Sequence, residues 1–134
     1  MTDKKQTARN FHNYKVWQDA VTFATLVYQV TSQLPWFEKK GLCDQLQRAV
    51  VSISSNIAEG SARSTDADFA RFLDQALGSA NEVETQLLTP CGDKFLKPKK
   101  AVCGSFQRIQ MLQFQRKLTR YVARNTVSHM LSEL

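Results

Sequence analysis

The sequence lacks any hydrophobic run suited to crossing a membrane, because no stretch approaches ~18 consecutive apolar residues. Its first residues, Met1–Asn10, are polar and charged, and a secretory signal needs an apolar segment there. We therefore interpret residues 1–12 as a flexible lead-in. We expect a cytoplasmic protein that has no membrane partner.

Cysteine and histidine are too few and too scattered to build a metal site. The three cysteines, Cys43, Cys91 and Cys103, form no Cys-x-x-Cys pair, and His12 and His129 lie near opposite ends of the chain. This pattern predicts reduced thiols, no disulfide framework and no bound metal. The phosphate-binding loop, the zinc-protease motif and the nucleophile elbow are also missing. We therefore predict a protein that is not an enzyme and holds no cofactor.

Strand signals are nearly absent, whereas apolar residues recur at three- and four-residue steps in four segments. These segments predict helices over residues 14–33, 42–59, 66–88 and 98–125. Short connections between helices of this length favour an all-α, antiparallel up-down-up-down four-helix bundle over residues 13–126. Residues 127–134 are interpreted as a C-terminal tail.

Three residues carry specific expectations about the helix ends and contacts. Thr65 is placed to cap the third helix, and Gly60 suits the left-handed residue that ends the second. Gly78 lies inside the third helix, where glycine costs roughly 1 kcal/mol relative to alanine. We expect a closely approaching neighbouring helix to offset that cost.

The buried stripes follow from the same spacing. The first helix offers either Leu26 or Val27 at one core position, and the third offers either Phe72 or Leu73. The remaining predicted core positions are Val16, Ala20, Phe23 and Val30; Leu42, Leu46, Val50, Ile53 and Ile57; Phe69, Ala76, Ala80, Val83 and Leu87; and Met111, Phe114, Leu118, Tyr121 and Val122.

Acidic residues are missing between Lys94 and Ser132, and Glu133 is the one acid after them. Residues 1–93 contain nine Lys/Arg and eleven Asp/Glu, whereas residues 94–132 contain nine Lys/Arg and no acid. A surface this positive attracts polyanions, nucleic acid first among them. The predicted phosphate-contacting residues are Lys94, Lys97, Lys99, Lys100, Arg108, Arg116, Lys117, Arg120 and Arg124.

Two other interpretations of the basic residues stay open. They could form a solubilising surface, or they could dock an acidic protein partner, which would make the protein an interaction scaffold. The arginines Arg116, Arg120 and Arg124 recur every four residues, where like charges repel, so helix stability does not explain them. Arginine also matches the geometry of phosphate, which favours RNA or DNA bound through its backbone.

Polar residues form one stripe on the second predicted helix and another on the third. We expect the two stripes to face each other in a structural network, with Arg48 paired to Glu59 or Glu82. Solvated faces are one alternative, and a catalytic site that uses Glu59 and Glu82 is another. The predicted members of the network are Arg48, Ser52, Asn56, Glu59, Glu82 and Gln86.

The larger aromatic residues could stack on bases, but their helical spacing favours places in the core. This expectation covers Trp17, Tyr28, Trp36, Phe37 and Phe106.

The segment Ser52–Gly60, with the sequence SISSNIAEG, resembles the signature of four-helix bundle proteins encoded in intervening sequences of bacterial 23S ribosomal RNA genes. The resemblance to this family, also called S23-like, extends over roughly residues 11–96. After Gly92 the chain departs from the family pattern, because lysines stand where the family has an acidic stretch. Other matching positions are Val16-Trp17, Leu34-Pro35, Gly41-Leu42, Phe72-Leu73, Gly78-Ser79 and Glu84-Thr85-Gln86-Leu87.

The resemblance implies a homopentameric ring of bundles. It also implies kinship with the accessory variability determinant of diversity-generating retroelements, whose basic pentamers bind nucleic acid and a partner reverse transcriptase. Together with the charge distribution, it gives the expected function: a self-associating, non-enzymatic RNA-binding or ribonucleoprotein accessory protein.

Overall fold

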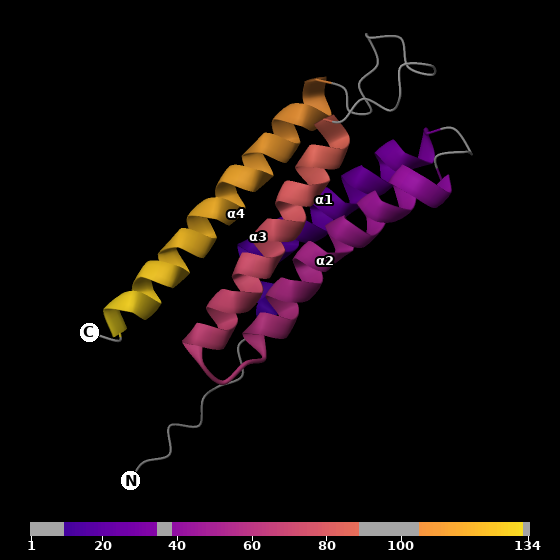
Figure 1. Ribbon diagram of the computed structural model, residues 1–134. Coiled ribbons are helices and arrows are strands. Elements are labelled where there is room, and N and C mark those ends of the chain that lie inside the picture. Colours follow the sequence, from indigo (N-terminus) through magenta and orange to yellow (C-terminus); the bar gives the residue numbers. More distant parts are fainter. Residues whose placement is uncertain (1–9, 35–38, 89–104, 133–134) are drawn as a thin grey trace.

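The computed structural model describes residues 10–34, 39–88 and 105–132, and the described part of the chain is helical with no strand. A short 3-10 helix, Phe11–Asn13, precedes α1, Lys15–Ser32, and a π-helical turn, Lys39–Cys43, leads into α2, Asp44–Ser61. The chain continues with α3, Asp66–Leu88, and α4, Ser105–Ser132. The prediction of an all-α chain with four helices is confirmed (Figure 1).

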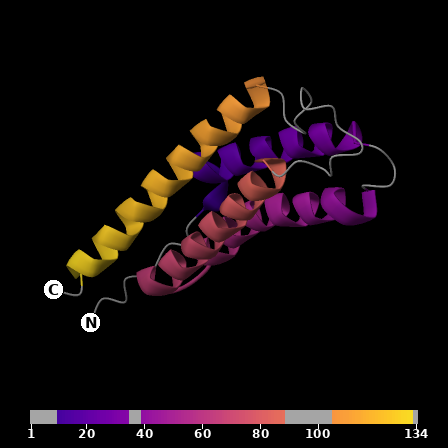
Figure 2. The same ribbon diagram turned by 45° about the horizontal axis from the view of Figure 1, so that its top comes forward.

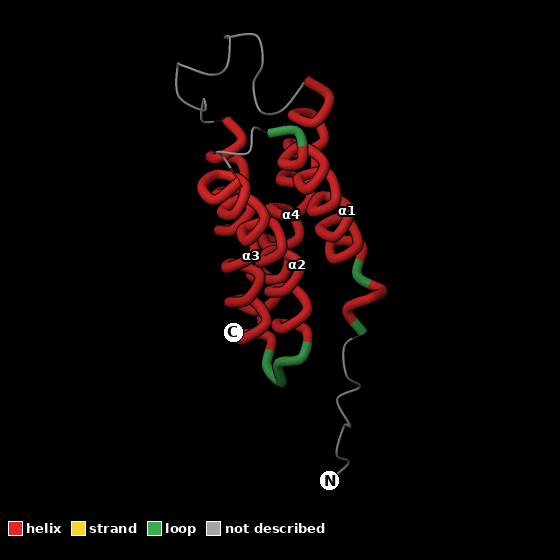
Figure 3. Tube along the Cα trace, turned by 90° about the vertical axis from the view of Figure 1, so that its right-hand side faces the viewer, coloured by secondary structure: helices red, strands yellow, loops and turns green. Residues whose placement is uncertain are grey.

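The helices pack in chain order around one core. The second helix, α2, lies against both α1 and α3, and α4 lies against α3 and α1. Figure 2 shows α4 as the outermost helix in that view, and Figure 3 shows the short connection between α2 and α3 at one end of the bundle. This arrangement leaves one long side of α4 without a neighbouring helix.

The core is built from most of the predicted apolar stripes: Leu42 and Tyr121 are only partly buried against it, and the side chain of Met111 lies outside the described residues. At the two positions with alternatives, Val27 is 2% exposed and Leu73 is completely buried, whereas Leu26 and Phe72 are only partly buried. Burying each such side chain contributes about 1.5–3 kcal/mol, so these stripes hold the bundle together. The largest side chains that are almost fully buried are Leu46, Ile53, Ile57, Leu73, Leu118, Val27, Val50 and Val83.

The prediction for Thr65 is confirmed, because its Oγ1 accepts a hydrogen bond of 3.2 Å from the backbone N–H of Asp68. The predicted first turns of the last helix, residues 98–104, lie outside the described residues, and α4 begins directly after Gly104. It continues through Asn125 to Ser132, since no glycine or proline interrupts residues 126–132.

Two glycine predictions are wrong. Gly60 lies inside the last turn of α2 without a positive φ, and it is buried. A Cβ built on Gly60 would lie 2.6 Å from the Cβ of Phe72 and 2.9 Å from a ring carbon of Phe69. Gly78, by contrast, is exposed, and a Cβ built there would meet nothing within 4 Å. The close helix approach therefore occurs at Gly60, and among the described residues no neighbouring helix comes close enough to Gly78 to offset its cost.

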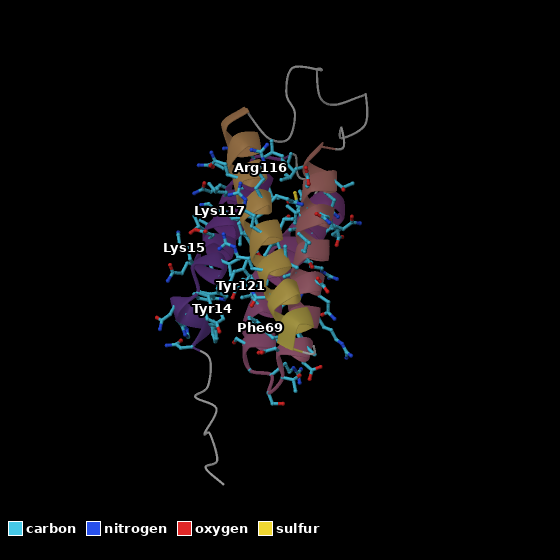
Figure 4. The ribbon with its side chains drawn as sticks, turned by 90° about the vertical axis from the view of Figure 1, so that its left-hand side faces the viewer. Tyr14, Lys15, Phe69, Arg116, Lys117 and Tyr121 are labelled. Carbon is cyan, nitrogen blue, oxygen red and sulfur yellow. The ribbon has the colours of Figure 1, made fainter. Side chains whose placement is uncertain are left out.

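Aromatic contacts hold α4 on the bundle. The rings of Phe23 in α1 and Phe114 in α4 stack with their centroids 4.8 Å apart. Tyr14, directly before α1, lies 6.5 Å from Tyr121 in α4 and 6.1 Å from Phe69 in α3, measured between ring centroids (Figure 4). The Phe23–Phe114 and Tyr14–Tyr121 contacts therefore fix the position of α4 relative to α1 at two places along the bundle.

None of the described helices has a segment both long and apolar enough to span a lipid bilayer.

Candidate nucleic-acid interface

Four of the predicted phosphate-contacting residues lie exposed on α4: Arg116, Lys117, Arg120 and Arg124. We call these four residues the basic face. Among the described residues, the three arginines form no ion pair within 4.0 Å, and Lys117 contacts only Asp19 of α1, at 3.8 Å. The charges of the basic face are therefore left largely uncompensated by the fold.

Three of the four residues of the basic face lie toward α1 rather than α3. Lys117 contacts α1 through Asp19, whereas Gln115 donates a hydrogen bond to Asn81 of α3. Residues three and seven positions after Lys117, namely Arg120 and Arg124, share its side of the helix. These three cations therefore gather along the border between α1 and α4, and Arg116 points about 100° away from Lys117 around the helix axis.

Lys15 extends this border, and sequence reasoning did not single it out. Its Nζ lies 2.6 Å from Asp19 Oδ1, while its side chain remains 78% exposed. Figure 4 shows Lys15 beside the same edge of α4 as Lys117. The signal available in the sequence was the four-residue spacing of Lys15 and Asp19. This spacing predicts an ion pair between the two side chains on one helix, but it does not predict that the pair lies next to α4.

The other predicted phosphate-contacting residues are not placed by the structure. Lys94, Lys97, Lys99 and Lys100 lie outside the described residues. The backbone of Arg108 belongs to α4, but its side chain is not among those described. The described part of the candidate interface therefore consists of the basic face and Lys15.

The polar stripes of α2 and α3 face each other through two side-chain contacts. The hydroxyl oxygens of Ser52 and Ser79 lie 2.7 Å apart, and Asn56 Nδ2 donates to the carbonyl and hydroxyl oxygens of Ser52 at 2.8 and 3.0 Å. Further along, Gln86 Nε2 donates to Gln45 Oε1 at 3.2 Å. Ser52, Ser79 and Asn56 satisfy one another at the helix interface, which is a structural role, whereas Gln86 Oε1 is buried without a hydrogen-bond partner among the described residues.

The charged members of the predicted network are arranged differently from the expectation. Arg48 forms its ion pair with Asp44, at 3.5 Å in the same helix, and its side chain is 81% exposed. Glu82 lies within the α3 stripe, where its Oε1 accepts a hydrogen bond from Gln86 at 3.2 Å. Glu59 is exposed at the other end of α2. The structure therefore brings Glu82 and Gln86 together but gives Arg48 a partner within its own helix.

The geometry does not assemble a carboxylate pair for catalysis from Glu59 and Glu82. The Ser52–Ser79 and Gln45–Gln86 contacts set a register in which Glu59 lies opposite Phe72, ten residues before Glu82. At a rise of about 1.5 Å per residue, the two glutamates are separated by about 15 Å along the helix axes. Paired catalytic carboxyl groups in glycosidases are roughly 5–9.5 Å apart. Within the described residues, no cluster of three or more His, Cys, Asp or Glu is arranged to hold a metal ion.

The aromatic residues divide between core and surface. Trp17 packs against the core as predicted, but the prediction for Tyr28 is wrong, because Tyr28 is 45% exposed beside α2. Trp36 and Phe37, together with the side chain of Phe106, lie outside the described residues. The thiol of Cys43 is buried and donates to the carbonyl oxygen of Thr31 at 3.6 Å.

Residues 12–103 match the family model described as the 23S rRNA-intervening sequence protein. The chain belongs to this family. No curated protein matches the chain. The match covers α1 to α3 and ends before α4 begins, so the basic face lies outside the matched range.

The segment Ser52–Gly60 of this 23S rRNA-intervening sequence protein has a clear structural purpose. Ile53 and Ile57 are completely buried, Ser52 contacts Ser79, and Gly60 allows α3 to approach. The segment therefore packs α2 on α3. This contact involves a different pair of helices from the α1–α4 border.

Proposed function

We propose that this 23S rRNA-intervening sequence protein is a non-enzymatic protein that binds RNA through its phosphate backbone. The observation that carries the proposal is the basic face: Arg116, Lys117, Arg120 and Arg124 lie exposed on a helix whose described length, residues 105–132, contains no acid. Cations that the fold leaves uncompensated are available to replace the counterions of a polyanion.

The distribution of charge around the bundle favours one side of α4 for the bound strand. The neighbouring helix α3 carries five acidic residues and one arginine, whereas α1 carries only Asp19 and Lys15. A nucleic-acid backbone is repelled from α3 and attracted to the α1–α4 border. Contacts of this kind position the strand without reading its sequence.

We also infer that the bundle has up-down-up-down connections and that copies of it self-associate in a ring, as the family resemblance implies. Among the described side chains, three of the four large apolar ones that are exposed, Val21, Tyr28 and Val51, belong to adjoining faces of α1 and α2. Tyr28 and Val51 line an open groove of about 420 Å³ between these helices. Exposed apolar groups gathered on one face favour association, and here we assign the face to a second copy of the chain.

Charge reversal tests the RNA interface with a matched control. The double variant Arg116→Glu/Arg120→Glu should weaken the binding of a labelled uridine dodecamer at low salt by at least roughly tenfold. The control, Arg48→Glu/Arg71→Glu, changes the net charge equally at exposed positions of α2 and α3 and should retain most of the affinity. Circular dichroism and the thermal midpoint confirm that both variants are folded.

Each other outcome contradicts the proposal in a different way. An equal loss in both variants would mean that only the net charge matters, and no loss in either would exclude the basic face. Absence of RNA binding, combined with tight binding of a defined acidic protein to the same face, would favour the scaffold interpretation.

A further inference from the structure

A small cavity of about 130 Å³ opens between α1 and α4, on the border where the basic face lies. Its floor includes Phe23 and Phe114, whose stacked rings are each only 5% exposed. Because the two rings face each other, their edges form an apolar base beneath an opening that Lys117 borders. Ligand sites for whole small molecules typically have ~300–1,000 Å³, so this cavity has room for one ring system rather than a complete nucleotide.

The wall of the cavity carries one carboxylate. The Asp19 side chain, 17% exposed, holds its two oxygens 2.6 Å from Lys15 Nζ and 3.8 Å from Lys117 Nζ. Each carboxylate oxygen has capacity for a further donor. A group that enters the cavity beside Asp19 is therefore favoured when it brings hydrogen-bond donors, because bonds to an ionised acceptor are the stronger ones.

We propose that the cavity binds one unpaired guanine base of the RNA strand whose phosphates contact the basic face. This inference rests on the proposed function. Guanine is the one standard base whose Watson–Crick edge presents two adjacent donors, N1–H and the exocyclic N2 amine, which match a carboxylate such as Asp19. Its O6 accepts a hydrogen bond, for which Lys117 is the available donor. Single-stranded RNA is read in this manner, by splayed bases that pack on aromatic rings and bond through their edges.

The position of the cavity agrees with a strand that follows the α1–α4 border. Lys117 belongs both to the basic face and to the cavity rim, so a phosphate held by Arg120 or Arg116 lies within one helical turn of the opening. Extruding a base from an already unpaired strand costs little compared with opening a duplex. The arrangement therefore adds base preference to an interface that otherwise recognises only charge.

The test compares three labelled RNA dodecamers by fluorescence anisotropy: uridine throughout, uridine with one central guanosine, and uridine with one central inosine. The wild-type protein should bind the guanosine oligomer roughly tenfold more tightly than the uridine oligomer. Inosine lacks the N2 amine and should lose most of this preference.

Two variants and a control test whether the preference for guanosine arises at this cavity. Asp19→Asn should abolish it while leaving the affinity for the uridine oligomer equal or higher, because the change removes a negative charge from the border. Thr22→Trp, a substitution at an exposed position of the rim, should fill the cavity and have the same effect on the preference. Asp44→Asn, which removes an ion-paired carboxylate from α2, should retain the full preference.

The outcomes separate this inference from the proposed function. If wild-type protein binds all three oligomers equally, the base site is overturned and the phosphate interface stands. If it binds none of them, both are overturned. If Asp19→Asn raises the affinity for all three equally and retains the preference, Asp19 acts only through its charge and the assignment to this cavity is wrong.

Discussion

α2 and α3 approach each other closely at Gly60 and Phe72, since a Cβ on Gly60 would lie 2.6 Å from the Cβ of Phe72. The obstructing atom is bonded to the backbone of α3, so it cannot swing aside. Gly60→Ala should therefore lower the free energy of unfolding by about 1–3 kcal/mol, despite the better helix propensity of alanine. Urea denaturation followed by circular dichroism measures the change, and unaltered stability would contradict the close approach.

Gly78→Ala should have the opposite effect. Gly78 lies inside α3, it is exposed, and the space around it is open within the chain. Alanine there should raise the free energy of unfolding by about 0.5–1 kcal/mol, because it reduces the entropy of the unfolded chain and adds no clash. A destabilised Gly78→Ala variant would show that another copy of the chain packs against this position.

Ser79→Ala tests the contact that joins the polar stripes of α2 and α3. The variant removes one hydrogen bond to Ser52 and should cost about 1 kcal/mol. Ser52→Ala/Ser79→Ala should cost less than the sum of the single changes, since it leaves neither hydroxyl unpaired. Ser55→Ala, at an exposed position of α2, is the control and should stay within about 0.5 kcal/mol of wild type. Strict additivity of the two serine changes would contradict the direct bond.

Val51→Asp tests self-association through the apolar side chains of α1 and α2. Val51 is 43% exposed in the single chain, so a charge there leaves the core intact but opposes burial against a second copy. Sedimentation velocity should show a wild-type assembly well above the chain mass of 15.2 kDa and a variant shifted toward the single chain. Gln75→Asp, exposed on α3, is the control and should retain the assembly. A monomeric wild-type protein would exclude the association altogether.

The helices and most of the core followed from periodicity, because one helix face must be apolar to be buried. The predicted bounds of the third helix, residues 66–88, and the predicted cap at Thr65 agree with the structure, because both depend on residues close together in the chain. The glycine roles could not be assigned this way. Gly60 and Gly78 look alike in the sequence, and only the distance between α2 and α3 separates a necessary glycine from a tolerated one.

The candidate site shows the same division between local and long-range information. Charge counting identified the basic face, but it could not place Lys15 and Asp19 beside it, because they lie about a hundred residues away along the chain. Arg48 was predicted to pair with Glu59 or Glu82, whereas its partner in the structure is Asp44, one turn away on the same helix. A neighbour at four residues is the easier contact for a long exposed side chain to form.

The most direct test of the central claim is the salt dependence of RNA binding by wild-type protein and four single variants, Arg116→Gln, Lys117→Gln, Arg120→Gln and Arg124→Gln. Each contacted phosphate contributes about −0.7 to the slope of log affinity against log salt for a single strand. We predict that every one of these substitutions makes the slope shallower by about 0.7. The control variants Arg48→Gln and Arg71→Gln should leave the slope unchanged. A slope that is the same in all six variants as in wild-type protein would show that the basic face does not contact the RNA.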